Sequence, residues 1–263
     1  MDPRDLLRSS LLGLSRATAV RDVIERAPVS RSVVKRFVPG STVEDALRAT
    51  GELQAVGRMV TIDHLGEDTT TRAQAEATRD AYLALLAALA ERHYSLSGKA
   101  EVSLKLTALG LLLPDGHQIA LDHARTISQA ATNAGTTVTV DMEDHTTTDA
   151  TLEAVQELRE DFPTTGAVLQ AYLRRTEGDC RDLAHAGSRI RLCKGAYQEP
   201  ESVAFQDGAE VDKSYVRCLK TLMAGEGYPM VASHDPRIVE IAAALAGRAG
   251  REPKTFEYQM LFG

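Results

Sequence analysis

The sequence contains no tryptophan and only three cysteines among its 263 residues. Cys180, Cys193 and Cys218 cannot all pair with one another, and none of them forms a C-x-x-C motif. Disulfide-rich secreted domains usually carry an even number of regularly spaced cysteines. The cysteine usage therefore argues against that class and predicts a protein of the reducing cytoplasm.

Long apolar runs and a basic net charge are also missing. No apolar stretch approaches the roughly 20 residues of a membrane span, and no secretory signal opens the chain. The formal net charge is −7, which argues against nucleic acid as a partner. Residues 1–40 are an exception, with eight Lys/Arg against four Asp/Glu. A helix over 5–27 is expected to pack on the domain, with a peripheral membrane contact as the alternative.

The glycine fingerprint G-x-G-x-x-G of doubly wound nucleotide-binding sheets is absent as well. Apolar alternation of period two instead takes turns with helical periodicity, and no hairpin signals intervene. This order predicts parallel strands joined by right-handed crossovers. The expected strands are 59–63, 101–106, 137–141, 167–172, 188–193, 230–233 and 255–260. The expected helices are 41–56, 71–93, 118–134, 148–160, 177–186, 209–226 and 235–248.

Seven strand–helix units favour a distorted (β/α)8 TIM-type barrel, in the α/β class. The sequence stops at Gly263, directly after the seventh expected strand. We therefore expect a barrel truncated before its eighth strand and helix. The expected domains are an N-terminal helical segment over 1–56 and the barrel over 57–263. Ser41 and Glu44 have the capping-box spacing for the start of the helix over 41–56. Thr71 and Gln74 have the same spacing for the helix over 71–93.

Polar side chains recur near the carboxyl ends of several expected strands, where barrel enzymes place their active sites. With side chains alternating in direction along each strand, one parity turns a single set of polar residues inward. This set is Ser103, Lys105, Thr139, Asp141, Gln170, Arg189 and Arg191. Because barrel interiors are otherwise filled with branched aliphatic residues, these side chains are expected to form one site.

Three kinds of site fit these residues. Lys105 or Lys194 could form a Schiff base, as in lyases and aldolases. The acidic segment 141–145 could bind a metal, although capping of the next helix by Asp144 is the preferred interpretation. An anionic cofactor could bind the positive charge of Arg191 and Lys194, because Gly195 would let a phosphate approach the backbone.

The segment 191–197, Arg-Leu-Cys-Lys-Gly-Ala-Tyr, resembles the R-L-V-K-G-A-Y segment of proline dehydrogenases. Further matching segments follow the family's order from about Phe37 to Gly263. They are 63–67, 103–107, 141–143, 170–172, 233–235 and 256–261. Cys193 replaces the more usual valine, and Ser233 stands where threonine is common. Seven short motifs in register make the resemblance specific.

The resemblance implies oxidation of L-proline to Δ1-pyrroline-5-carboxylate by a flavoenzyme. Hydride would pass to N5 of FAD, and a membrane quinone would then take the electrons. The expected location is cytoplasmic, with a peripheral contact on the inner face of the cell membrane. The family also has a helix after its eighth strand, which carries a tyrosine and two arginines that clamp the substrate carboxylate. Because this helix is not in the sequence, a catalytically inactive flavin-binding fragment remains an alternative.

The resemblance also implies roles for individual residues. Arg191 and Asp141 would be catalytic, with Arg191 beside flavin N5 and Asp141 orienting the charges around Lys105. Lys105 would pair with the proline carboxylate, and Tyr197 and Leu261 would wall the proline ring. The residues expected to bind FAD are Met142, Gln170, Arg191, Lys194, Gly195, Ala196, Ser233 and His234.

Overall fold

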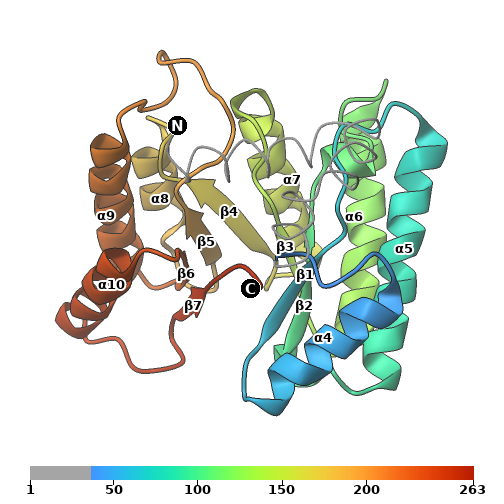
Figure 1. Ribbon diagram of the computed structural model, residues 1–263. Coiled ribbons are helices and arrows are strands. Elements are labelled where there is room, and N and C mark those ends of the chain that lie inside the picture. The colour runs from blue at the N-terminus through green and yellow to red at the C-terminus, as the bar shows by residue number, and fades with distance from the viewer. Residues whose placement is uncertain (1–36) are drawn as a thin grey trace, which may run out of the picture. The chain divides into compact units, whose positions relative to one another are not determined.

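A computed structural model describes residues 37–263, so the predicted helix over 5–27 lies outside the described residues. The chain divides into two compact units. The first contains the described residues up to Thr139, together with Phe262 and Gly263, and the second runs from Val140 to Leu261. Figure 1 labels the helices and strands of both units.

The first unit alternates helices and strands as the sequence predicts. Its elements are α4 (Val43–Ala55), β1 (Val60–Asp63), α5 (Arg72–Glu91), η1 (Leu96–Gly98), β2 (Ala100–Leu104), η2 (Thr107–Leu109), α6 (Gly116–Asn133) and the start of β3 (Val138–Val140). Strands β1 and β2 pair in parallel, with Asp63 opposite Ser103. Every residue of β2 is buried, which is typical of a parallel strand covered on both faces.

Side-chain caps fix where the helices of this unit begin. Thr71 and Gln74 form the predicted capping box of α5, in which the threonine hydroxyl accepts from the Gln74 N–H. The capping box of α4 is one residue later than predicted. Thr42 and Asp45 form it, rather than Ser41 and Glu44. Both pairs have the same spacing and chemistry, so the sequence alone does not distinguish them.

The second unit continues the alternation to the end of the described chain. Its elements are η3 (His145–Thr147), α7 (Thr148–Asp161), β4 (Gly166–Gln170), α8 (Thr176–Leu183), β5 (Arg189–Cys193), α9 (Gly208–Ala224), β6 (Tyr228–Ala232), α10 (Pro236–Arg248) and β7 (Glu257–Gln259). Strands β4 to β7 pair in parallel in the order of the chain. Helices α8, α9 and α10 lie along one side of these strands (Figure 1).

Strand β5 shows the predicted alternation. Ile190 and Leu192 are buried, whereas Arg189, Arg191 and Cys193 are partly accessible. The two apolar side chains therefore point to one face of the sheet and the two arginines to the other. Parallel strands with intervening helices confirm the predicted α/β class.

Candidate active site

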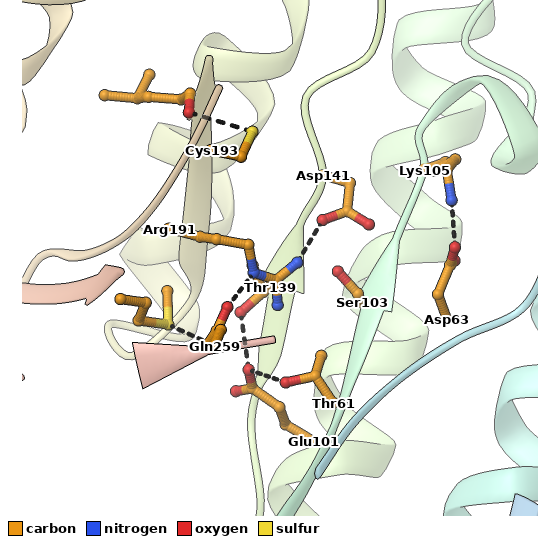
Figure 2. Close-up of polar contacts among 12 residues, drawn as sticks. Thr61, Asp63, Glu101, Ser103, Lys105, Thr139, Asp141, Arg191, Cys193 and Gln259 are labelled. Atoms are coloured by element: carbon orange, nitrogen blue, oxygen red, sulfur yellow. Dashed lines mark hydrogen bonds and ion pairs between the residues drawn. The ribbon is translucent and has the colours of Figure 1, made fainter. Parts of the chain in front are cut away.

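Arg191, in the middle of β5, is a cation held by two side chains of the second unit. Its Nη1 donates to Asp141 Oδ1 at 2.6 Å, and its Nε donates to Gln259 Oε1 at 2.6 Å (Figure 2). The side chains of Arg191 and Asp141 are only 13% and 18% exposed. Two charge-assisted or polar contacts at different nitrogens fix the orientation of the planar guanidinium as well as its position.

Gln170 ends β4 as a buried amide of fixed orientation. Its side-chain Nε2 donates to the main-chain carbonyl oxygen of Glu143 at 2.7 Å. The main-chain carbonyl oxygen of Gln170 accepts from the Thr176 hydroxyl at 2.6 Å. With Nε2 bound to Glu143, the side-chain Oε1 is the group of this amide that can accept a hydrogen bond from a bound molecule. Met142, one residue before Glu143, is also buried.

Lys194 follows β5 and contacts two carboxylates. Its Nζ lies 2.5 Å from Asp212 Oδ1 and 3.3 Å from Asp235 Oδ2. Asp235 caps α10 by accepting from the N–H of Arg237, and the Arg237 guanidinium contacts the same carboxylate at 2.7 Å. This hydrogen bond to Arg237 holds the pKa of Asp235 well below its usual range. Charges of both signs therefore meet at the first turn of α10.

Ser233 and His234 immediately precede this cap. The Ser233 hydroxyl accepts from the Asp235 N–H at 3.1 Å, and the Ser233 N–H donates to the Gln259 carbonyl at 3.2 Å. His234 is exposed, and its Nε2 accepts from the Leu261 N–H at 2.9 Å. The Leu261 side chain is 58% exposed. The structure thus brings together the segments that carry two predicted cofactor residues and one predicted substrate residue.

Gly195 has a structural requirement that the sequence does not reveal. Its φ is +108°, and an added Cβ would lie 2.2 Å from the Tyr172 ring. Only glycine satisfies both conditions without displacing the ring. The ring of Tyr172 occupies the space that a side chain would need, and the expected approach of a phosphate to this backbone stays a prediction. Beyond it, Ala196 is exposed and Tyr197 packs against a cluster that contains Tyr172.

Cys193 departs from the family's usual valine without introducing a charge. Removal from water raises the pKa of its thiol to about 12, so the thiol stays protonated near neutral pH. Its Sγ donates weakly to the Leu169 carbonyl oxygen at 3.5 Å. The substitution therefore preserves a small neutral side chain at this position.

The first unit has its own polar group at the ends of β1 and β2. Lys105 Nζ contacts Asp63 Oδ2, and the side chains are 14% and 29% exposed (Figure 2). The hydroxyl of Tyr82, a buried residue of α5, donates to the Ser103 carbonyl at 2.6 Å and lies 3.3 Å from Asp63 Oδ1. Asp141 contacts Arg191, and its expected role in orienting the charges around Lys105 stays a prediction.

A second group of polar contacts lies nearer the starts of β1 and β2 and includes one residue of β3. Buried Glu101 accepts from the Thr61 hydroxyl at 3.0 Å and from the Thr139 hydroxyl at 3.2 Å (Figure 2). Two hydrogen bonds to the carboxylate offset part of the cost of burying it. Thr139 therefore contributes to the packing of the first unit.

In the acidic segment after β3, Asp144 caps the short helix η3, whereas the expected cap of the following helix is not formed, because α7 begins after Thr147 without a side-chain cap. Asp144 caps η3 by accepting from the Thr146 N–H at 2.9 Å. Within residues 37–263, no group of three or more His, Cys, Asp or Glu side chains is placed to hold a metal ion. The hydrogen bond from the Thr146 N–H gives the Asp144 carboxylate a capping role at η3.

Comparison with known proteins gives a family-level match. The model of the family described as Proline dehydrogenase matches residues 46–263. The chain belongs to the proline dehydrogenase family. Proline dehydrogenase 1 of Bacillus subtilis (strain 168) is 34% identical over 234 residues, which cover 89% of this chain and 76% of that protein. Proline dehydrogenase of Deinococcus radiodurans is 34% identical over 255 residues, covering 93% and 81%.

Solved structures support the same fold for this proline dehydrogenase family member. Proline utilization A (PutA) from Bdellovibrio bacteriovorus superposes with a TM-score of 0.79 at 24% identity. The superposition covers 93% of this chain and 30% of the PutA chain. The resemblance stated from the motifs and the predicted barrel-type fold are both confirmed.

Several residues of the two contact groups were not singled out by sequence reasoning. Asp63 and Gln259 lay inside quoted family motifs, yet their partners Lys105 and Arg191 are 42 and 68 positions away. Tyr82 belongs to a helix that reads as an ordinary apolar element. The parallel register of β1 with β2 was the available signal for Asp63, because it places Asp63 opposite Ser103.

Proposed function

We propose that the protein oxidises L-proline to Δ1-pyrroline-5-carboxylate, the first step of proline catabolism, with FAD as the hydride acceptor. Membership of the proline dehydrogenase family supports the reaction. The observation that carries the cofactor assignment is the fixed guanidinium of Arg191, held by Asp141 and Gln259. In the reaction, proline loses a hydride from a ring carbon and a proton from nitrogen, and a C=N bond forms.

Two residues of the second unit fit a flavin ring. Flavin enzymes tune the ring by hydrogen bonds to its nitrogens and by charge near N1 and N5. Gln170 offers a side-chain Oε1 that can accept from a ring N–H, and its Nε2 donates to Glu143. Arg191 offers a cation whose direction does not have to be reorganised during the reaction. Met142, a buried apolar residue that follows Asp141, is also assigned to the cofactor.

Bound FAD would supply the acceptor for the hydride, which carries both electrons of the oxidation. Arg191 stabilises the negative charge that arrives with the hydride, because its guanidinium stays charged throughout the physiological pH range. Asp141 keeps the guanidinium in position through its 2.6 Å contact. The roles of Arg191 and Asp141 are thus electrostatic support and orientation.

The phosphate groups of the cofactor are assigned to the segments after β5 and β6. Lys194 provides a positive charge, and Gly195 and Ala196 provide accessible backbone. Ser233 and His234 precede the N-terminus of the 13-residue helix α10, where the helix dipole favours anions. A bound phosphate would compete with Asp212 and Asp235 for Lys194.

The substrate carboxylate is assigned to Lys105. Its ammonium group is mostly shielded from water and already faces one carboxylate, Asp63. A lysine acts as a flexible point charge, so it can turn toward a second anion without losing the first. Tyr197 and Leu261 are assigned to the walls around the proline ring.

A Schiff-base enzyme is the competing function. Its nucleophile is a lysine amine in an apolar pocket or beside another cation. Both candidate lysines have carboxylates around them instead, Asp63 at Lys105 and two aspartates at Lys194. A carboxylate beside a lysine stabilises the charged ammonium form, whereas nucleophilic attack needs the neutral amine, so these surroundings disfavour the Schiff-base function.

A quinone is proposed as the acceptor that reoxidises the flavin, reached by a peripheral contact with the cytoplasmic side of the membrane. The described helices include none that is long and apolar enough to span a bilayer. The basic segment that would make this contact lies within residues 1–40, mostly outside the described residues.

Anaerobic mixing of the FAD-loaded protein with L-proline tests the proposal. We expect the visible flavin absorption to bleach and to return when a soluble quinone analogue is added. FAD binding without bleaching would indicate a flavin-binding protein that does not oxidise proline. Failure to bind FAD, together with borohydride trapping of an aldehyde on Lys105 or Lys194, would establish the Schiff-base alternative.

A further inference from the structure

The segment from Lys194 to Asp207 connects β5 to α9 without a helix or strand of its own. Structureless connections of about this length are uncommon in compact domains and are usually functional. Fixing the backbone of each residue costs conformational entropy. Specific contacts must therefore hold the segment in place, and the structure provides two sets of them.

Glu199 makes the first set. Its side chain is 3% exposed although it belongs to a surface connection. Its Oε1 accepts from the His145 N–H at 2.9 Å and from the Tyr172 hydroxyl at 3.4 Å, and its Oε2 contacts His145 Nδ1. Gln206 Nε2 donates to the Glu199 carbonyl at 3.1 Å. One carboxylate thus joins the segments that follow β3, β4 and β5.

Main-chain hydrogen bonds make the second set. The Phe205 N–H donates to the Tyr172 carbonyl at 2.8 Å, and the Arg174 N–H donates to the Val203 carbonyl at 2.9 Å. The Arg174 guanidinium also lies 4.7 Å from the centre of the Phe205 ring. These contacts secure the far end of the segment, close to α9, but leave the end near β5 to other residues.

Near β5, the Tyr172 N–H donates to the Lys194 carbonyl at 2.9 Å. Gly195 to Gln198 therefore lie between two fixed points, the Lys194 carbonyl and the Glu199 carboxylate. Burial, and then the charge of Glu199, raise the pKa of the Tyr172 hydroxyl well above its usual value, so it remains a donor. The ring of Tyr172 closes the space at Gly195.

A buried carboxylate is a poor choice for stability alone. Buried ion pairs can often be replaced by apolar residues of similar volume without loss of stability. What the carboxylate provides is direction, because its two oxygens meet a backbone N–H, a hydroxyl and an imidazole at once. The residues whose shape depends on it include Gly195, Ala196 and Tyr197, which the proposed function assigns to cofactor and substrate.

We propose that Glu199 is a positioning residue, whose carboxylate holds the span Gly195–Gln198 in the shape that receives the phosphate end of FAD. This inference rests on the proposed function. Glu199 would not touch the cofactor or the substrate. It would act through the backbone between Lys194 and itself.

Replacement of Glu199 by alanine or glutamine tests the inference. We expect Glu199→Ala to weaken FAD binding by about tenfold or more, since loss of a buried partner costs roughly 1–3 kcal/mol. Glu199→Gln keeps an acceptor for the His145 N–H and should recover part of the affinity. FAD affinity is measured by flavin fluorescence on addition of FAD to the apoprotein. Backbone mobility is measured separately by amide hydrogen exchange of residues 194–207 without cofactor.

Glu201→Ala is the matched control, because Glu201 is exposed two residues further along the same segment. It removes the same charge from the loop without removing a buried contact. The proposal predicts faster exchange over 194–200 and weaker FAD binding for Glu199→Ala but not for Glu201→Ala. Equal FAD affinity and equal exchange in the two variants would overturn it, as would a lower melting temperature with unchanged exchange in this segment.

Tyr172→Phe provides a milder test if Glu199→Ala does not fold. It removes one hydroxyl contact to the carboxylate and keeps the ring against Gly195. A smaller change in the same direction is expected, and no change in exchange would count against the proposal. If the unmodified protein does not bind FAD, the proposed function fails, but the exchange comparison still decides whether Glu199 fixes the segment.

Discussion

The two units place a cation at the end of a strand in different ways. In the second unit, Arg191 is held at two nitrogens by an aspartate and a glutamine. In the first unit, Lys105 has one nitrogen, which contacts Asp63, and a buried tyrosine hydroxyl lies on the other side of that aspartate. The contacts of Arg191 fix the orientation of its guanidinium group, whereas the contact of Lys105 with Asp63 fixes mainly the position of its ammonium group.

This difference matches the tasks proposed for the two residues. A guanidinium aimed in one direction suits a rigid flavin ring, whose charge appears at a defined position during the reaction. An ammonium group on a flexible chain suits a small substrate that must enter and leave. The comparison therefore predicts that loss of Arg191 affects the chemical step and loss of Lys105 affects substrate binding.

The largest effect is expected for Arg191→Ala. Loss of one preorganised electrostatic contact typically costs about 2.7–4 kcal/mol, or a rate decrease of roughly 100- to 1,000-fold. Stopped-flow measurement of flavin reduction by proline should show this decrease, or the purified variant should have lost its FAD. Arg189→Ala is the control, because Arg189 lies on the same strand two residues closer to its start. Equal reduction rates in both variants would mean that Arg191 is only structural.

Lys105→Ala should chiefly raise the KM for proline. A lost hydrogen bond to a charged group costs about 1.5–3 kcal/mol, which corresponds to roughly a 10- to 150-fold change. FAD content should stay at the level of the unmodified protein. Lys213→Ala removes a lysine from an exposed pair with Glu210 and serves as the control. A decrease in flavin reduction at saturating proline, without a change in KM, would contradict the assignment.

The strands and most helices could be predicted because their signals are local. Alternation in β5 and the cap of α5 depend on residues within a few positions of one another. The partners of the charged residues depend on register and on distant segments. Glu199 meets His145 across 54 positions, and Arg191 meets Gln259 across 68. No periodicity in the sequence encodes which of several carboxylates reaches a given cation.

The neighbourhood of a predicted residue can also change the reason for its identity. Gly195 was expected to be a glycine for the sake of a ligand, and the structure gives a packing reason in Tyr172. That contact joins residues 23 positions apart and involves the ring of a strand-end tyrosine. The family motif includes this glycine, but only the structure supplies this physical cause.

Tyr82→Phe and Tyr215→Phe sharpen the comparison between the units. Each hydroxyl donates to a strand carbonyl, Tyr82 to Ser103 at 2.6 Å and Tyr215 to Leu192 at 2.9 Å. Urea denaturation should show a similar loss of unfolding free energy for both, about 1–2 kcal/mol. Only Tyr82→Phe should also raise the KM for proline, by a few-fold, because only Tyr82 contacts Asp63. The same KM in both variants would show that Tyr82 does not influence Lys105.

The smallest effect concerns acid stability at the start of α10. Hydrogen bonding to Arg237 lowers the pKa of Asp235 in the folded protein. In the unfolded chain this aspartate has an ordinary pKa of about 3.9. The folded state therefore binds fewer protons than the unfolded state, and the resulting stability is present above the unfolded pKa. It is lost progressively as pH falls from about 5 toward the lowered value.

Asp235→Asn keeps a good N-cap and removes this titration. Melting temperatures recorded between about pH 7 and pH 2.5 should fall less steeply for the variant than for the unmodified protein below about pH 4. The difference between the two proteins should be small, because Arg237 is largely exposed and water screens the pair. Salt should reduce the difference further, since exposed charges are screened within about 10 Å at 0.1 M. Parallel curves for the two proteins would show that the Asp235–Arg237 contact does not contribute to stability. Asp235 would then act only as an N-cap, a role that asparagine fills equally well.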